Sequence, residues 1–423
     1  MAINRRNFLR SSAVALAGSY LFKPDIQGSS KGNDSIETIG SADDEQWWKF
    51  LKSQFSLKED LYYFNNGSLG PSPEYVIDKT EKYRRTLDSF PSRYMWGGWE
   101  KDKEEVRIRV SEYFDTDREE IALIHNTSEG MNLFARSFDL KAGDEIILAN
   151  HEHRTGVVPY EYYCKPLGVK LVRPVLPLLP KSADEIVDIY RRAISEKTRI
   201  ISMVHMTNTN GMILPVKEIS SIAREKGIIL CVDGAQAVGM IKFRISDLGC
   251  DYYAASGHKW LFGPKGSGIL YASRDKQELL KPLMVSSKWD NINIRMFEDY
   301  NTRNLPELLG MGAAFDFNNM IGQDRKQARI YSLKKYFRDQ VDGDNRFKIK
   351  TPEPDDLSAG IQAVEVKGRV VTEARDYLLS NYNIDCRPMY SHDLNALRIS
   401  LSVFNTREDI DYLIVALREF ADK

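Results

Sequence analysis

Cysteine is scarce in this chain, which holds four in 423 residues: Cys164, Cys231, Cys250 and Cys386. Their spacing is wide and no CxxC pair occurs, so neither a structural zinc site nor a disulfide-dense scaffold is expected. Cys231 lies inside an apolar run and is therefore interpreted as a small buried side chain rather than a reactive thiol.

Net charge is also nearly absent. Lys and Arg number 59 and Asp and Glu number 60, which leaves a formal net charge of −1. Non-specific nucleic-acid binding needs a basic surface that neutralises phosphates, so nucleic acid is not an expected partner. Long apolar runs are missing too, and the short stretch 11–18 cannot span a bilayer as a helix. We expect the mature protein to be soluble, without a membrane segment.

Two arginines stand near the N-terminus. Arg5 and Arg6 precede the short, weakly apolar stretch 11–18, a pattern that resembles a twin-arginine export signal. The only A-x-A triplets lie inside that stretch, which leaves the cleavage position open. We expect residues 1–30 to form this signal and a linker, and the protein to be periplasmic or exported by the twin-arginine route.

Short apolar segments alternate with helical segments from about Ile121 onward. Such short buried strands, separated by helices, predict an α/β fold with a largely parallel sheet covered on both faces. We expect this large domain over residues 60–300, and the charged segment Glu100–Phe114 within it to be an amphipathic helix. The candidate strands are Glu145–Leu148, Val169–Val172, Ile200–Val204, Ile228–Val232 and Ser267–Tyr271.

The pattern changes after residue 305. Gln323–Val341 and Arg407–Phe420 predict helices that flank several short strand candidates, which indicates a smaller α+β domain over residues 305–423. Near the N-terminus, Asp43–Phe55 places acidic residues before aromatic residues at helical spacing and predicts an amphipathic helix.

Two neighbouring motifs contain the residues that are candidates for a catalytic or ligand-binding site. Asp233 ends an apolar strand in VDGAQAVG (232–239), and α/β sheets bind ligands at that edge. Lys259 follows in SGHKW (256–260), ahead of GPKGSGILY (263–271). Alone, such an aspartate is often a helix cap and such a lysine is usually solvated. Together, the motifs resemble the class V aminotransferase family of pyridoxal-phosphate (PLP) enzymes, which includes cysteine desulfurases and isopenicillin N epimerase. The resemblance extends from about Tyr62 to the C-terminus.

The resemblance implies a fold and a cofactor. The fold is that of the type I PLP-dependent transferases, with a seven-stranded-type, mostly parallel sheet and a small C-terminal domain against which helix 43–56 packs. PLP requires a lysine that binds its aldehyde and a carboxylate that holds its pyridinium proton. By resemblance these are Lys259, which also serves as the base for the substrate α-proton, and Asp233. His153, in the EHRT segment, stacks on the ring and completes the implied catalytic set.

Further residues are assigned to the cofactor by the same resemblance. Asn208 and Gln236 lie near the ring oxygen, and the NTSEG turn before an apolar helix supplies N–H groups suited to a phosphate. The implied phosphate contacts are Thr127, Ser128, Ser256 and His258. Thr302 resembles a threonine that reaches the phosphate of the other subunit, although Asn301 replaces the usual glycine. A homodimer with a shared active site is therefore implied. No metal is expected, because the His151–His153 triplet lacks HExxH spacing.

The substrate side of the pocket is implied at the C-terminus. Arg398, in NALRIS, resembles the family's arginine that pairs with the substrate α-carboxylate, a role that suits its bidentate geometry. Asn66 and Ser68 are expected to line the same side. The expected partner is therefore a small amino acid or a compound that contains one.

The reaction is open among several members of the family. Arg387 matches the arginine that precedes the catalytic cysteine of desulfurases, but the following segment, 388–397, holds no cysteine, which disfavours desulfurase chemistry. The short loop and the NNGSLGPSP segment look more like the isopenicillin N epimerase branch. Transamination needs a keto-acid co-substrate, which an exported enzyme is poorly placed to receive, whereas epimerisation needs none. We therefore expect an epimerase or racemase, with an aminotransferase or a C–S lyase as alternatives.

A protein that only binds ligands on this fold is a further alternative. Such a protein would be expected to lose the lysine, the aspartate or the arginine clamp. Lys259, Asp233, Gln236, His153 and Arg398 are all present, which argues for an enzyme.

Overall fold

The computed structural model describes residues 43–423, apart from 287–288, 291 and 392–393. The predicted export signal and linker at 1–30 lie outside the described residues. Within the part of the chain that the structure describes, no helix is both long and apolar enough to cross a membrane.

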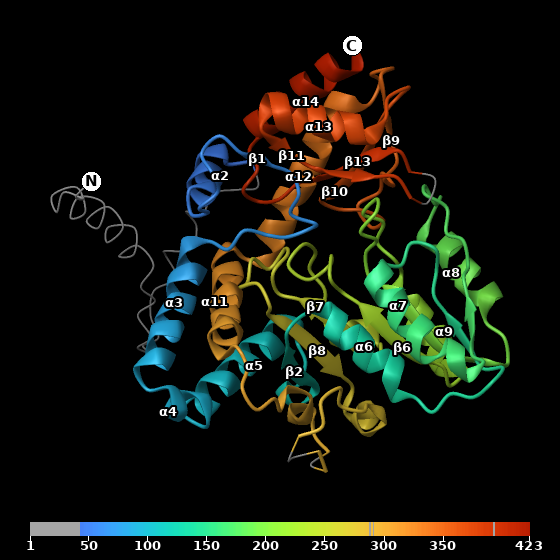
Figure 1. The fold of residues 1–423 in the computed structure, drawn as a ribbon. Coiled ribbons are helices and arrows are strands. Elements are labelled where there is room, and N and C mark those ends of the chain that lie inside the picture. Colours follow the sequence, from blue (N-terminus) through green and yellow to red (C-terminus); the bar gives the residue numbers. More distant parts are fainter. Residues whose placement is uncertain (1–42, 287–288, 291, 392–393) are drawn as a thin grey trace, which may run out of the picture. The chain divides into compact units, whose positions relative to one another are not determined.

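A seven-stranded sheet lies at the centre of the large domain (Figure 1), in the order β2-β8-β7-β6-β5-β3-β4. β8 is antiparallel to both of its neighbours, and the other adjacent pairs are parallel. The sheet is therefore mostly parallel, as predicted. Its strands are β2 (Ile121–Ile124), β3 (Glu145–Ile147), β4 (Lys170–Val172), β5 (Thr198–Val204), β6 (Ile229–Asp233), β7 (Tyr252–Ser256) and β8 (Gly268–Ala272).

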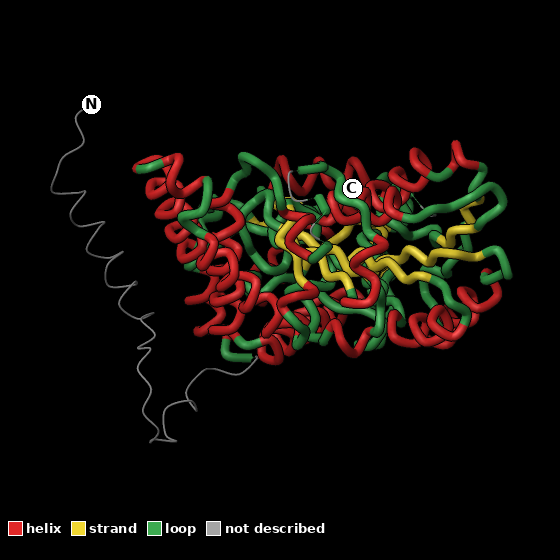
Figure 2. The backbone as a smooth tube through the Cα atoms, turned by 90° about the horizontal axis from the view of Figure 1, so that it is seen from below, coloured by secondary structure: helices red, strands yellow, loops and turns green. Residues whose placement is uncertain are grey.

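Helices cover both faces of this sheet (Figure 2). Successive side chains of a strand point to opposite faces. In β6, Leu230 and Val232 join one hydrophobic cluster, and Cys231 joins the other. Because both faces are buried, the strands read as continuous apolar runs rather than as alternating ones. The Cys231 face is covered by α6 (Thr127–Ser137) and α7 (Arg154–Tyr163), and the other face by α3 (Glu74–Ser89), α5 (Glu100–Phe114), α8 (Ala183–Ala193), α9 (Val216–Glu225) and α11 (Leu305–Ile321).

The C-terminal part of the chain builds a second, antiparallel sheet in the order β12-β13-β10-β9. In β13, Leu397 and Ile399 pack into a hydrophobic cluster with the helices, so Arg398 points to the opposite face. This alternation directs the arginine away from the small core. The elements are α12 (Gln323–Val341), β9 (Phe347–Ile349), β10 (Ile361–Val366), α13 (Val371–Tyr382), β12 (Arg387–Met389), β13 (Ala396–Ser400) and α14 (Arg407–Ala421).

The first described elements are bonded to this C-terminal part. β1 (Tyr62–Tyr63) pairs in parallel with β11 (Ile384–Asp385), although the two strands are far apart in sequence. α2 (Glu45–Lys52) is shorter than the predicted helix and lies near α14 in Figure 1. Lys52 Nζ of α2 is 2.7 Å from an oxygen of Asp409 at the start of α14. Salt bridges and strand pairing thus hold residues 45–63 against the C-terminal sheet and helices.

A buried histidine lies directly after the carboxyl end of β5. His205 follows β5, and its Nδ1 is 3.0 Å from the hydroxyl of Tyr253. Burial lowers the pKa of His205 to about 4, so the imidazole is neutral in the folded protein at neutral pH.

We expect this group to destabilise the protein in acid. Because the folded-state pKa lies below the ordinary value of 6.5, the unfolded chain binds the proton first, and stability is lost as pH falls from 6.5 toward 4. Because the unfolded chain takes up this proton first, acidification from neutral pH to pH 4 should lower the free energy of unfolding by about 3 kcal/mol. Denaturant unfolding across a pH series, on the wild type and His205→Asn, measures it. An acid-side slope that is equal in both proteins would contradict this expectation.

Candidate active site

The carboxyl ends of three central strands meet at one cavity. Val204, Asp233 and Ser256 are the last residues of β5, β6 and β7, and all three line a cavity of about 300 Å³. Ligands of open α/β sheets bind at this edge. The cavity collects most of the residues that the sequence singled out: Ser68, Thr127, Ser128, His153, Asn208, Asp233, Gln236, Ser256, His258 and Lys259.

The other predicted residues lie around this cavity. Arg398 reaches two of the residues that line it, Ser68 and Asn208, through hydrogen bonds. Asn66 is fully buried, and neither its amide oxygen nor its amide nitrogen has a partner among the described residues. Thr302 is exposed and lines a neighbouring cavity of about 860 Å³, which shares Asn126 and Ser128 with the first.

The start of α6 forms the anion-binding end of the cavity. The side chain of Asn126 caps the helix by accepting from Glu129 N at 3.0 Å. The backbone N–H of Thr127 donates to Ser256 Oγ at 3.0 Å, and the two hydroxyl oxygens lie 2.9 Å apart. Gly130 permits this close approach of α6 to β7, because an added Cβ would lie 2.4 Å from the Cβ of Ala254. A helix N-terminus flanked by two hydroxyl groups suits a phosphate.

His258 also supports a phosphate site at this end of the cavity. Its Nδ1 is buried and has no hydrogen-bond partner in the described part of the chain. Burial, together with Lys259 and Lys265, lowers the pKa of His258 to about 4. A buried nitrogen without a partner is costly, and a phosphate in the cavity would supply one. The residues present therefore fit a phosphorylated cofactor.

Lys259 and Asp233 form the chemical centre of the cavity. Asp233 is 5% exposed, and its Oδ1 accepts from Ala235 N at 2.9 Å. Burial lowers the pKa of Lys259 to about 8, while Asp233 opposes this shift and Arg398 and Arg387 add to it. A lysine with a lowered pKa is unprotonated to a larger fraction at neutral pH than an ordinary one, so more of it can act as a nucleophile and base.

We expect the uptake of PLP by the apo-protein to follow this pKa. Only the neutral amine attacks an aldehyde, so the rate should rise with pH and level off above about 8. The cofactor's visible absorbance, followed by stopped flow across a pH series, measures the rate. A midpoint near 10.5, the ordinary value for lysine, would show that the site does not perturb Lys259.

The segment after Lys259 is held by residues that sequence analysis did not single out. The side-chain nitrogen Nζ of Lys326, on α12, donates to Trp260 O and to Asn318 Oδ1, both at 2.5 Å. Asn318 Nδ2 in turn donates to Leu261 O at 2.7 Å. These contacts surround Phe262, whose φ of 65° is unusual for a bulky side chain. No local pattern marks Lys326, because its partners lie on other elements.

The N-terminal segment closes over the other side of Lys259. Gly67 O accepts from Gln236 Nε2 at 2.8 Å, and Gly70 N donates to His258 O at 2.8 Å. Only glycine fits at position 70, because an added Cβ would lie 2.0 Å from the carbonyl oxygen of Lys259. The NNGSLG segment is therefore part of the site wall.

His153 stands at the start of α7. Its Nδ1 is 2.7 Å from Thr155 Oγ1, and burial lowers its pKa. Thr155 also lines the cavity. Thr155 belongs to the EHRT motif, but no local pattern predicts a role for it; its hydrogen bond to the ring nitrogen orients His153.

Arg398 lies behind Ser68 as a buried cation. It is 1% exposed and donates only to neutral acceptors: Asn208 O at 3.0 Å, Ser68 Oγ at 2.6 Å and Asn65 Oδ1 at 3.1 Å. It forms no salt bridge with any residue that the structure describes. Burial and the neighbouring Arg387 lower its pKa to about 9. A buried guanidinium without a carboxylate partner is suited to bind one from a ligand.

No cysteine is in reach of the site. All four cysteines of the chain are described, and all four are buried and free. Cys386 precedes β12, and burial raises the pKa of its thiol. The cavity therefore offers no reactive thiolate.

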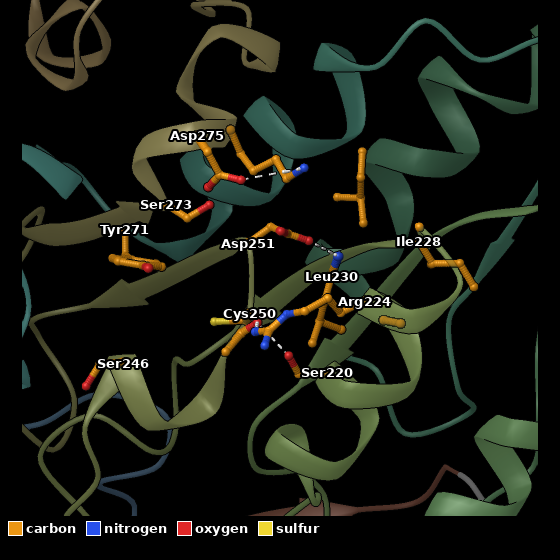
Figure 3. A pocket seen from close by; sticks show the side chains of 15 residues that line it. Ser220, Arg224, Ile228, Leu230, Ser246, Cys250, Asp251, Tyr271, Ser273 and Asp275 are labelled. Carbon is orange, nitrogen blue, oxygen red and sulfur yellow. Dashed lines mark hydrogen bonds and ion pairs between the residues drawn. The ribbon is translucent and has the colours of Figure 1, made fainter.

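A third cavity, of about 450 Å³, lies at the opposite end of the central strands (Figure 3). It is lined by Ile229, which begins β6, and by Asp251, which precedes β7. None of the predicted site residues lines it. We therefore place the active site in the smaller cavity, at the carboxyl edge of the sheet.

Comparisons with known proteins agree with this fold. A mutant of the lyase C-DES with glycine covalently linked to its PLP cofactor has a similar structure, with a TM-score of 0.77 at 21% identity, covering 86% of this chain and 98% of that one. The fold is therefore that of the type I PLP-dependent enzymes. Residues 61–413 match the family described as aminotransferase class V. The chain belongs to this family and is a PLP-dependent enzyme.

Two curated relatives are similarly close. Isopenicillin N epimerase from Amycolatopsis lactamdurans is 29% identical over 393 residues, covering 88% of this chain and 98% of the relative. A probable cysteine desulfurase from Halalkalibacterium halodurans is 29% identical over 394 residues, covering 85% of this chain and 93% of the relative. Overall similarity thus favours neither reaction.

Proposed function

We propose that this enzyme inverts the α-carbon of an amino acid or of a compound that contains one, as an epimerase or racemase. The observation that carries the proposal is the combination around one cavity of a lysine with a lowered pKa, a buried arginine without a carboxylate partner, and no thiol. The lysine and arginine suit proton removal from an α-amino acid. The lack of a thiol speaks against persulfide chemistry.

The chain's own residues provide a place for PLP. The start of α6 with the neighbouring hydroxyls would hold the phosphate, Asp233 would face the ring nitrogen, and Lys259 would bind the aldehyde. When bound, PLP withdraws the electron pair that a departing α-proton leaves behind. The remaining proposed contacts are His153 against the ring and Asn208 and Gln236 near its oxygen.

The protein's part in the reaction is to orient the substrate and move protons. Arg398 would hold the α-carboxylate through its free Nε and remaining N–H groups. This anchor fixes the α-carbon near Lys259, whose neutral amine would accept the α-proton. Asn66 and Gln236 are buried in the wall of the cavity. This wall would keep water away from Lys259 while its amine carries the α-proton.

The predicted export and the epimerase relative support inversion over transamination. A periplasmic or exported enzyme lacks a steady keto-acid supply, and inversion consumes no co-substrate. Isopenicillin N epimerase from Amycolatopsis lactamdurans shares 29% identity over almost its whole length.

Proton NMR in D₂O tests the reaction. The PLP-loaded enzyme is incubated with a panel of L-amino acids and peptide-like α-amino acids. Inversion predicts loss of the α-proton signal together with appearance of the opposite stereoisomer. Keto acid that forms only when an amino acceptor is added would instead establish an aminotransferase, and release of sulfide or persulfide would establish a C–S lyase.

We also propose that the enzyme is a homodimer with a shared site. Thr302 is exposed beside the open cavity next to the α6 start, where a second subunit has room to contribute. Large apolar side chains on the same stretch of chain, Met284 and Val285, are 58% and 70% exposed. Sedimentation analysis of the PLP-loaded protein tests this, and a monomer that retains full activity would refute it.

A further inference from the structure

Two arginines face each other at the rim of the active-site cavity. In the antiparallel pair β12–β13, Arg387 is directly opposite Arg398. Like charges directly opposite on adjacent strands repel and destabilise the sheet. Burial lowers the pKa of Arg398, and the charge of Arg387 lowers it further. Such a pair is stabilised when anionic groups bind to it, either one anion between both guanidinium groups or one anion at each of them.

The two guanidinium groups converge on one hydroxyl. Arg398 Nη2 donates to Ser68 Oγ at 2.6 Å, and Arg387 Nη1 donates to the same oxygen at 3.2 Å. A serine hydroxyl can accept two hydrogen bonds and donate one. Both acceptor positions of Ser68 are therefore used, and its proton is left for an acceptor that no described residue supplies. Ser68 also lines the cavity, so that acceptor would come from the ligand.

Neither arginine is neutralised by the protein. Among the described residues, no carboxylate forms a salt bridge with Arg387 or Arg398. The nearby Asp385 instead accepts from Asn65 Nδ2 at 3.1 Å. The rim thus carries two positive charges, one deep and one exposed to solvent. A single α-carboxylate neutralises one of them.

We propose that Arg387, Arg398 and Ser68 form a site for two anionic groups, so that the substrate carries a second carboxylate or similar acidic group besides its α-carboxylate. This inference rests on the proposed function for the role of Arg398. The buried Arg398 takes the α-carboxylate, and the exposed Arg387 takes the distal group at the mouth of the cavity. Ser68, between them, donates to whichever group lies nearer.

Binding of two matched probes tests the proposal without turnover. Glutarate carries two carboxylates, and glutaramate has the same shape with one of them replaced by a neutral amide. Calorimetry with the PLP-loaded enzyme should show glutarate binding about tenfold more tightly than glutaramate, because one charged hydrogen-bonded contact is lost. In Arg387→Gln this ratio should fall to near one, while Arg387→Lys should keep part of it. The control Arg191→Gln removes an exposed arginine of α8 and should leave the ratio at the wild-type value.

The ratio is measured within each variant, so a general loss of stability does not change it. Equal affinity for both probes in the wild type would overturn the proposal, since both arginines would then hold one carboxylate. A wild-type ratio that survives in Arg387→Gln would overturn it as well. The proposed function is tested separately, by α-proton exchange in D₂O of the whole panel of amino acids and peptide-like α-amino acids described above. A preserved binding ratio without any exchange would refute the inversion reaction and leave the dianion site standing.

Discussion

Replacing Lys259 by alanine is expected to abolish α-proton exchange, with a rate loss of about 10³-fold or more. The physical reason is that the cavity holds one amine, and burial adjusts its pKa to about 8. The visible absorbance of bound PLP should also change, because the covalent link between protein and cofactor is lost. Exchange in D₂O and the absorbance spectrum of the same sample provide two independent measurements.

Lys265 supplies a matched control for this variant. It belongs to the same glycine-rich loop, and its Nζ donates to Ser72 Oγ at 3.1 Å, but it does not line the cavity. Lys265→Ala should keep the PLP absorbance and most of the exchange. Exchange that survives in Lys259→Ala would mean that the active site lies elsewhere, and loss in both variants would mean that the loop, not the amine, is required.

Asp233→Asn is expected to reduce turnover by about 10²–10³-fold, because a preorganised charge is removed from the cofactor site while the side-chain shape is kept. The asparagine oxygen can still accept from Ala235 N, so the local turn should survive. PLP should still bind covalently, since Lys259 is unchanged. Steady-state exchange rates should therefore show the loss in kcat rather than in cofactor content.

A second readout separates charge from structure at this position. Asp233 raises the pKa of Lys259, so its removal should move the midpoint of PLP uptake below about 8. Asp247→Asn, an exposed change on α10 (Ile245–Leu248), controls for the general effect of losing a carboxylate. If Asp233→Asn shifts neither the midpoint nor kcat, Asp233 does not face the cofactor ring.

Local periodicity in the sequence predicts many helices and strands of the fold correctly. The helices predicted at Glu100–Phe114 and Gln323–Val341 have those bounds in the structure, because amphipathic spacing and helix length are written in adjacent residues. The short apolar runs became strands of the mostly parallel sheet within a residue or two. Helix α3 (Glu74–Ser89) was not predicted, although it packs over a face of the sheet.

Pairing between distant segments could not be predicted in the same way. β8 runs antiparallel within an otherwise parallel sheet, and β1 pairs with β11 near the other end of the chain. A two-residue strand such as Tyr62–Tyr63 carries no signal of its partner. Strand direction and partner are decided by which apolar faces can be buried together, which depends on the whole chain.

The sequence by itself determined the family and the cofactor through its resemblance to the class V aminotransferases, and with them most residues that line the cavity, because a PLP site needs a lysine, an aspartate and phosphate donors in short motifs at strand ends. Tertiary structure alone decided the environment of those residues. Burial lowers the pKa of Lys259, Lys326 clamps the loop that follows it, and register sets Arg387 opposite Arg398. These properties depend on distances between elements far apart in the chain, since desolvation and charge repulsion act through space and leave no local pattern.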